Sequence, residues 1–134
     1  MKLSTKSEYA CLALIDLAEH YAKGLIKSED IARRKKLPKK FLDQILFTLK
    51  NSGYVKSKRG SAGGYRLAKT PSQITIAEIL RLMDGALAPV YSVSTYFYEK
   101  TPIEQNKKML KILKEIRDYV AEKLEKTTLA DIVS

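Results

Sequence analysis

The chain has 134 residues and a formal net charge of +10, with 45% hydrophobic and 30% charged residues. This length suits one compact domain or a small domain with an appended helix, and the hydrophobic content is too high for a disordered chain. One cysteine and one histidine exclude a disulfide framework and a metal site of clustered cysteines and histidines, while the charge favours a polyanionic partner.

The excess positive charge lies in one segment, residues 33–69, which holds twelve of the 25 basic side chains and one of the 15 acidic ones. Such a segment predicts nucleic acid as the partner, and a solvated charged face is the alternative. The strongest apolar run near the N-terminus, residues 9–15, lies between Glu8 and Asp16 and is too short to span a membrane. We therefore expect a cytoplasmic protein with no membrane partner.

Two helices are predicted before residue 35. Apolar side chains recur at helical spacing over residues 7–23, on a face wide enough to pack on two sides, and Gly24 follows as a candidate C-cap. A short helix is predicted over residues 28–34, with Ser28 as its N-cap and acidic residues in its first turn. Residues 35–38 interrupt the helical pattern and separate this helix from the next one.

A third helix is predicted over residues 39–51, after Pro38, which favours a first helical turn. One of its faces is apolar and the other is basic and polar. Two short helices of this kind, joined by a tight turn, form the helix-turn-helix pattern. Residues 54–59 and 65–68 are predicted strands around the glycine-rich turn 60–64, and a hairpin at this place is a wing.

The C-terminal half is predicted to hold two more helices. The first covers residues 76–84, capped by Thr75 and stopped by Gly85. The second covers residues 103–126 and would be about 36 Å long. Its apolar positions alternate in spacings of four and three, and a small domain leaves no core for so long an edge, so pairing with a second chain is predicted. The predicted dimerisation residues are Met109, Leu113, Ile116 and Val120.

The expected fold is mostly α: a winged helix-turn-helix with a two-stranded wing and a long C-terminal dimerisation helix. The expected organisation is a DNA-binding domain over residues 1–84, an aromatic loop over residues 85–102, and the dimerisation helix with a C-terminal tail over residues 103–134. Two interpretations stay open for the aromatic loop: its side chains line an effector pocket, or they pack the loop against the long helices. These side chains are Tyr91, Tyr96, Phe97 and Tyr98.

The sequence shows no constellation of catalytic residues, so we predict no enzymatic activity. His20 and Cys11 have no neighbours that would make a ligand set, so His20 is expected to be a partly buried structural histidine and Cys11 a small hydrophobic residue of the core. The glycine turn lacks the Gly-Lys-Ser/Thr of a phosphate-binding loop and lies between strands rather than before a helix.

Several segments match, in order, a family of bacterial regulators. These segments are MKLSTK at 1–6, YA at 9–10, ALIDLA at 13–18, IA at 31–32, FLDQIL at 41–46, LKNSG at 49–53, VKSKRG at 55–60, GGYRL at 63–67, ITI at 74–76, DGALAPV at 84–90 and TLADI at 128–132. The chain thus resembles the winged-helix regulators typified by the iron–sulfur cluster regulator, the nitric-oxide-sensitive repressor and the cysteine-metabolism repressor. The resemblance implies a homodimeric transcription factor with its third helix in a major groove, its wing at a minor groove and its long helices crossing at the dimer interface.

The cluster-binding members carry three cysteines in the loop before the long helix. Here Ser92 stands where the first is expected, and residues 86–102 contain none. Glu8 stands where some members supply an acidic ligand, but one carboxylate does not hold a cluster. We therefore predict no iron–sulfur centre, no metal and no other cofactor, and a signal that comes from a small-molecule effector, a protein co-regulator, or no input at all.

The residues predicted to contact DNA lie on the second and third helices and the wing. They are Ser28, Lys39, Lys40, Phe41, Asp43, Gln44, Lys58, Arg59, Gly60, Gly63 and Gly64. Gln44 is suited to adenine, Asp43 either accepts from a cytosine amino group or repels phosphate, and Arg59 is the candidate for the minor groove. Phe41 is expected to anchor the packing and to touch a thymine methyl group, and the lysines and Ser28 to meet phosphates. The glycines either let the wing approach DNA or simply form the turn, and for Lys39 and Lys40 a solvated face is the alternative.

The predicted function is a sequence-specific regulator of transcription that binds double-stranded DNA, a repressor acting as a homodimer on a pseudo-palindromic operator. The alternative is a protein-interaction module whose basic surface binds an acidic partner. An RNA-binding function ranks last, because the basic segment lacks an aromatic platform for splayed bases.

Overall fold

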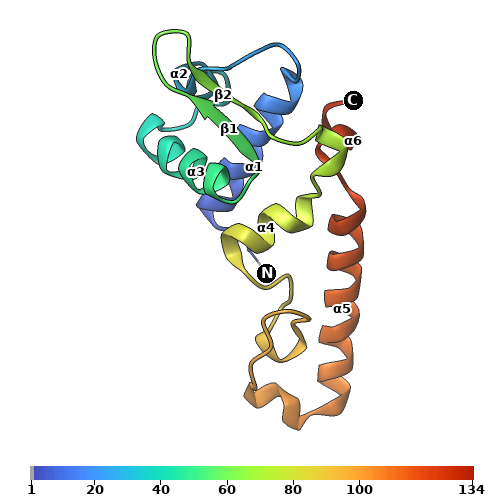
Figure 1. The fold of residues 1–134 in the computed structure, drawn as a ribbon. Coiled ribbons are helices and arrows are strands. Elements are labelled where there is room, and N and C mark those ends of the chain that lie inside the picture. The colour runs from blue at the N-terminus through green and yellow to red at the C-terminus, as the bar shows by residue number, and fades with distance from the viewer. Residues whose placement is uncertain (1) are drawn as a thin grey trace.

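The structure is a computed structural model that describes residues 2–134. Residues 2–84 form a helical part with a hairpin, called the head below, which is joined to a long C-terminal helix (Figure 1). The main elements in chain order are α1 (Thr5–Glu19), α2 (Ser28–Lys35), α3 (Lys39–Asn51), β1 (Val55–Lys58), β2 (Gly64–Leu67), α4 (Ile76–Asp84), α5 (Lys107–Lys126) and α6 (Leu129–Val133). This arrangement confirms the predicted winged helix-turn-helix with a long C-terminal helix. Across residues 2–134, none of the helices has the length and apolarity needed to cross a membrane.

The core of the head is built around α1, which contacts α2, α3, α4 and α6. Ala10, Ala13 and Leu14 on α1 are fully buried, together with Leu42 and Leu46 of α3. The wide apolar face predicted for the first helix is therefore confirmed, because this helix packs against neighbours on several sides.

The wing is an antiparallel hairpin in which Val55 lies opposite Leu67 and Lys58 opposite Gly64. Ile26, in the turn between α1 and α2, adds an isolated bridge to Tyr65, with backbone hydrogen bonds of 2.8 and 2.7 Å. The outer edge of β2 is thereby partly paired, which ties the hairpin to the helix-turn-helix.

The first two helices differ from the prediction at their ends. The helix predicted over residues 7–23 begins at Thr5, because Ser4 caps it by accepting a hydrogen bond from the Ser7 backbone N–H, and it ends at Glu19. Ser28 is the first residue of α2 and not its N-cap, a position that Lys27 takes without a side-chain hydrogen bond.

The C-terminal helices also differ from the prediction. The helix predicted to begin at residue 103 begins at Lys107, because residues 102–105 form a 3-10 turn and Asn106 accepts a hydrogen bond from the Met109 backbone N–H. The tail folds into α6, capped by Thr128. Leu129 of α6 is fully buried in the head, so the chain returns there after α5.

Both predicted ends of α4 are confirmed. The Thr75 hydroxyl accepts from the Glu78 backbone N–H at 3.3 Å, and the Glu78 carboxylate accepts from the Thr75 backbone N–H at 2.8 Å. The Tyr54 hydroxyl donates to the same carboxylate at 2.7 Å, and Gly85 ends the helix with a φ of 85°. Glu78 therefore links α4 to the residue that precedes the wing.

Acid should destabilise the fold through Glu78. Burial opposes its ionisation, but hydrogen bonds from Thr75 and Tyr54 outweigh it, so the pKa of Glu78 lies below its ordinary 4.5. A carboxyl group with a lowered folded-state pKa contributes stability above its unfolded pKa and loses it as the pH falls through the folded value. We expect urea unfolding to show that the free energy of unfolding decreases as the pH is lowered from about 4.5. This decrease should be less steep in Glu78→Gln. The same slope in both proteins would contradict this assignment.

Candidate nucleic-acid interface

The third helix presents to the outside a ridge of three polar side chains and one phenylalanine. Its apolar residues Leu42, Ile45, Leu46 and Leu49 are buried in the core, so the opposite side of the helix faces solvent. Lys40, Gln44, Phe47 and Asn51 follow one another at spacings of four, three and four, which places them on one face, and all four are exposed. The structure thus presents Gln44 and Lys40 outward, as expected of a helix that reads a groove.

Lys39 is engaged within the protein. Its ammonium group lies 2.9 Å from a carboxylate oxygen of Asp43 and 3.6 Å from one of Glu29. The hydrogen bond to Asp43 is the main reason why the pKa of Lys39 is raised. A phosphate would compete with Asp43 for Lys39, and this competition couples the two predicted DNA-contacting residues.

Phe41 is not the packing anchor that the sequence predicts. Its side chain is 57% exposed, because it lies at the edge of the apolar face of α3. It forms one wall of a shallow apolar groove between α3 and α1, to which Thr5, Lys6 and Tyr9 contribute the other wall. This groove borders Gln44.

The wing holds Lys58 and Arg59 in solvent, next to the glycine turn. The Lys27 ammonium donates to the Ser61 carbonyl at 2.7 Å and so fastens the tip of the wing to the start of α2. A groove runs between this hairpin, α2 and α3, and Lys27, Ser28, Lys50, Lys58 and Arg59 are among its lining residues. Ser28 is nearly buried within it.

Two of the wing glycines have a structural role. A Cβ at Gly63 would lie 2.0 Å from the Lys58 carbonyl oxygen, and one at Gly64 would lie 2.6 Å from the Ile26 carbonyl oxygen. At Gly60, where φ is 101°, a Cβ would point into open space. The turn therefore requires glycine at positions 63 and 64 whether or not DNA is present, which supports the hairpin-turn interpretation for these two.

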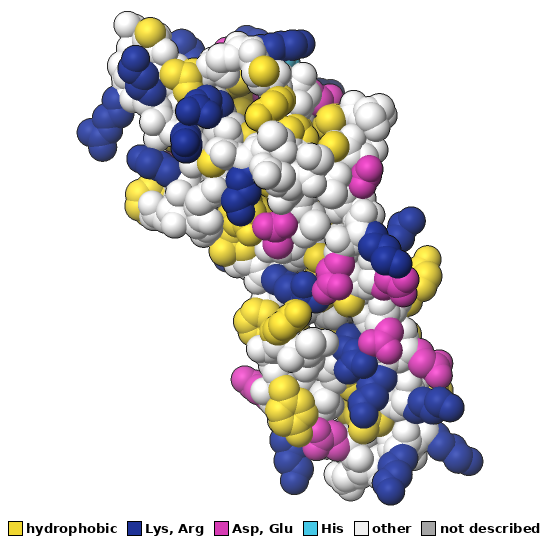
Figure 2. Space-filling view, turned by 45° about the vertical axis from the view of Figure 1, so that its right-hand side comes forward, with side chains coloured by type: hydrophobic (Ala, Val, Ile, Leu, Met, Phe, Trp, Pro, Cys, Tyr) yellow, Lys and Arg dark blue, Asp and Glu magenta, His cyan; other side chains and the backbone are white. Residues whose placement is uncertain are grey.

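The charge separates along the molecule. Figure 2 shows lysine and arginine side chains over the head with few acidic ones, whereas basic and acidic side chains alternate over the part that contains α5. The basic segment of residues 33–69 belongs to the head. The positive charge of this segment therefore lies on the same part of the molecule as α3 and the wing.

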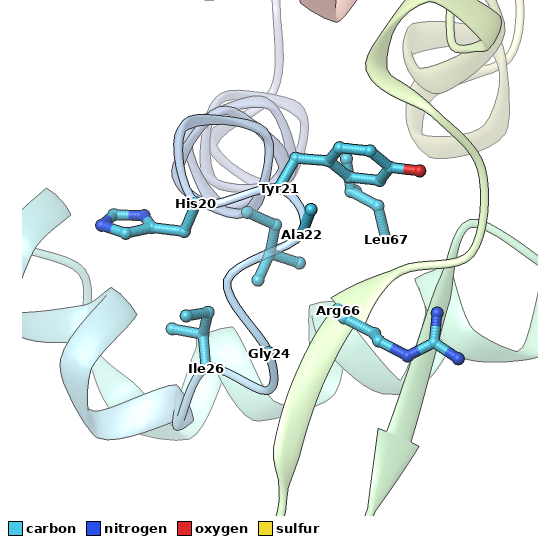
Figure 3. Close-up of a pocket in the computed structure, with 8 residues that line it drawn as sticks. His20, Tyr21, Ala22, Gly24, Ile26, Arg66 and Leu67 are labelled. Carbon is cyan, nitrogen blue, oxygen red and sulfur yellow. The ribbon is translucent and has the colours of Figure 1, made fainter.

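A small cavity of about 130 Å³ lies between the end of α1 and β2. Figure 3 shows His20 and Arg66 directed to opposite sides, away from each other. The His20 Nδ1 is 2.7 Å from the Asp16 carbonyl oxygen, which satisfies it as a structural histidine. Leu17, Ile26 and Leu67 supply apolar lining, so this cavity is a packing gap beneath the wing and not a centre of acid–base chemistry.

Helix α5 leaves an apolar face uncovered. Met109 and Ile116, two of the predicted dimerisation residues, are 41% and 42% exposed. The other two, Leu113 and Val120, are half-buried on the side of the chain's own loop and α4. Ile112 and Tyr119, which are not among the predicted dimerisation residues, are 52% and 72% exposed. The uncovered face is therefore Met109, Ile112, Ile116 and Tyr119.

The loop before α5 packs through small side chains. Ser92, Val93 and Ser94 are buried, and the Arg117 guanidinium donates to the Val93 carbonyl at 2.9 Å. The aromatic side chains of the loop are Tyr91, Tyr96, Phe97 and Tyr98. They are 42–68% exposed in the single chain, although the Arg81 guanidinium lies 4.8 Å from the centre of the Tyr96 ring and the Tyr98 hydroxyl donates to Glu104 at 2.6 Å. Both interpretations of the loop, an effector pocket and packing against the paired long helices, stay predictions.

Two short helices with an outward ridge, a basic wing and a long helix with an uncovered apolar face define a winged helix-turn-helix regulator. The sequence pattern of the Rrf2 family, described as an iron-dependent transcriptional regulator, matches residues 3–134, and the chain belongs to this family. It is a DNA-binding regulator of transcription, and its relatives are named as regulators and not as enzymes.

Three comparisons are informative. The chain is 37% identical to the HTH-type transcriptional regulator CymR of Bacillus subtilis over 134 residues, covering 100% of this chain and 91% of that one. The solved structure of CymR, the global cysteine regulator of B. subtilis, is similar with a TM-score of 0.81 at 34% identity, over 99% and 96% of the two chains. The structure of T. potens IscR is similar with a TM-score of 0.78 at 30% identity, over 99% and 86%.

The donor groups of this chain do not fit an iron centre. The single thiol of the sequence is Cys11 of α1, which is half-buried and packs against the core instead of lying within it as predicted. Burial, and next the charge of Asp84, raise its pKa to about 11, whereas metal ligation needs the thiolate. Within residues 2–134, no three Cys, His, Asp or Glu side chains gather in a way that could hold a metal.

Proposed function

We propose that the chain is a cytoplasmic repressor of transcription that binds a pseudo-palindromic operator as a homodimer, without an iron–sulfur cluster. The observation that carries this proposal is the ridge of Lys40, Gln44 and Asn51 on α3, displayed beside the cationic groove that runs to the wing. A helix placed in the major groove by such a ridge has phosphates on either side of it. The residues 1–84 carry this surface.

The reading helix and the wing divide the work in this proposal. Gln44 makes a bidentate contact to adenine, since its amide carries both a donor and an acceptor. Arg59 enters the minor groove, where narrow A·T tracts concentrate negative potential. Lys40, Lys58 and Ser28 meet phosphates, and the backbone at Gly60 is open to a close approach.

Asp43 acts through its ion pair with Lys39. When Lys39 turns to a phosphate, the Asp43 carboxylate loses its partner at 2.9 Å. It then needs a hydrogen-bond donor, which a cytosine amino group supplies in the major groove. A site without that cytosine leaves a bare carboxylate near phosphates, and this disfavours wrong sequences.

The homodimer is formed by the uncovered face of α5. Pairing this face with its counterpart in a second chain removes four large apolar side chains from water on each subunit. A two-fold axis there presents two reading helices, which demands half-sites separated by about one helical turn of DNA or a multiple of it.

Gln44→Ala should weaken binding by about 1 to 3 kcal/mol at one base position of each half-site and relax the preference there. The measurement is a titration of duplexes recovered from a random library, each with single base-pair changes, at two salt concentrations. Gln105→Ala, the same change in the turn before α5, is the control. An equal loss on every sequence would refute the assigned role, and indifference to duplex DNA in dilute salt would refute the proposed function.

Ile116→Glu should convert the dimer to a monomer, because a charge would enter the apolar centre of the interface. Lys114→Gln, which alters the net charge by the same amount on another face of α5, should leave the dimer intact. Sedimentation velocity at micromolar concentration distinguishes the two states. A wild-type chain that sediments as a monomer would contradict the proposed assembly.

A further inference from the structure

The reading helix carries two exposed phenylalanines, an unusual content for a surface that meets a polyanion. Phe47 is 62% exposed and Phe41 is 57% exposed. Each is three residues from Gln44 in the chain, on opposite sides in sequence. At about 100° per residue they lie roughly 60° to either side of Gln44 around the helix axis. Gln44 is thus bracketed by two apolar rings.

Phe47 belongs to the outward ridge and not to the core. Leu42, Leu46 and Leu49 occupy the buried side of α3, and Phe47 projects from the opposite side. It lines the groove between α3 and the wing, where its neighbours Lys50 and Lys58 are exposed cations. Where cations bind phosphates at the edges of the major groove, a ring on the ridge lies over the base edges between them.

The major groove offers one apolar group, the C5-methyl group of thymine, and a phenylalanine ring is one of the side chains that contacts it. Three residues of helix advance about 4.5 Å along the axis, against 3.4 Å between stacked bases, so a ring three residues from Gln44 reaches a neighbouring base pair. An adenine read by Gln44 and flanking thymines would satisfy all three side chains.

We propose that Phe47 is a specificity-determining residue that recognises the C5-methyl group of a thymine next to the base pair contacted by Gln44, with Phe41 contacting a second thymine on the other side. This inference rests on the proposed function, because it assigns a base preference to the same DNA-binding surface. It makes each half-site an A·T-rich step selected by methyl groups as well as by hydrogen bonds.

The test replaces thymine by deoxyuridine, one position at a time, in a duplex enriched from a random library by the wild-type protein. Deoxyuridine pairs with adenine and keeps every hydrogen-bonding group and charge, so only the methyl group is lost. We expect wild-type affinity to fall about 3- to 10-fold at one position in each half-site for Phe47 and at a second position for Phe41.

The variants complete a double-mutant cycle. Phe47→Ala should bind the thymine duplex as weakly as the wild type binds the deoxyuridine duplex, and should lose discrimination at that position only. Phe41→Ala should lose it at the other position. Phe97→Ala, which removes an exposed phenylalanine from the loop before α5, should keep full discrimination at both. Phe47→Leu keeps an apolar side chain and good helix propensity, so it should retain part of the discrimination even if Phe47→Ala folds poorly.

The outcomes separate this inference from the function on which it rests. Tight, sequence-selective binding that is insensitive to deoxyuridine at every position overturns the role of the phenylalanines and leaves the DNA-binding proposal standing. Discrimination that persists in Phe47→Ala and Phe47→Leu also overturns it. Failure of the wild type to enrich any duplex overturns the proposed function, and the inference falls with it.

Discussion

Arg34→Ala is expected to destabilise the folded chain by about 3 to 5 kcal/mol. The Arg34 guanidinium donates two hydrogen bonds of 2.8 Å, through Nε and Nη2, to the two carboxylate oxygens of Asp16. The Asp16 side chain is fully buried, whereas Arg34 is 32% exposed. Removing the guanidinium leaves the buried carboxylate with only the His20 Nδ1 nearby, at 3.8 Å, which costs far more than losing a surface ion pair. The total free energy of unfolding of a domain of this kind is only about 5 to 15 kcal/mol.

Arg33 provides the matched control for this prediction. It is the preceding residue on α2, its side chain is 71% exposed, and it pairs with Asp30 at 3.3 Å in solvent. Arg33→Ala should cost less than about 1 kcal/mol. Arg34→Lys should be intermediate, because an ammonium keeps the charge and loses the two-point contact. Urea unfolding followed by circular dichroism measures all three, and equal losses in the two alanine variants would sink the prediction.

Gly63→Ala should cost about 3 kcal/mol and deform the wing. The added Cβ would meet the Lys58 carbonyl oxygen at 2.0 Å, and a backbone atom cannot rotate away as a side chain can. The backbone N–H of Gly63 also donates to the Gly60 carbonyl at 3.0 Å, so opening the turn breaks that bond as well. Because Lys58 and Arg59 sit on this hairpin, DNA affinity should fall together with stability.

Gly60→Ala distinguishes crowding from backbone strain in the same turn. Its φ of 101° strains an alanine, but the Cβ would enter open space, so a loss of about 1 to 2 kcal/mol is expected. Thermal unfolding and duplex titration of both variants give the comparison. If Gly63→Ala is no less stable than Gly60→Ala, the hairpin relaxes more easily than its geometry indicates.

The central elements of the fold could be predicted from the sequence because their signals are local. The apolar period of α3, the Thr75 cap and the glycine turn are each encoded within a few neighbouring residues. The N-terminal end of α1 could not be predicted in this way. Ser4, which caps it, also donates to the Asp84 carboxylate, a partner 80 positions away in the chain. α6 was missed because its burial depends on the return of the chain to α1 after α5.

In the candidate site, too, the features that depend on neighbouring residues could be predicted, and those that depend on distant elements could not. The outward direction of Lys40 and Gln44 follows from helical periodicity alone. The pairing of Lys39 with Asp43 was also within reach of the sequence, since these residues lie four positions apart on a helix. The structural need for glycine at position 64 was not, because the crowding comes from Ile26, in another element.

The sequence by itself determined the order of the elements from α1 to α5, the concentration of positive charge in residues 33–69, and the lack of thiols for a cluster. The tertiary structure decided which of those cations are held by carboxylates of the protein and which are available to a partner. Arg34 keeps part of its surface in solvent but binds a buried carboxylate 18 positions earlier, while Lys58 and Arg59 remain in solvent on the wing, with no ion pair among the described residues. Helix periods and turn residues act over one or two turns of chain, whereas the burial of a charge depends on which distant segment is packed against it.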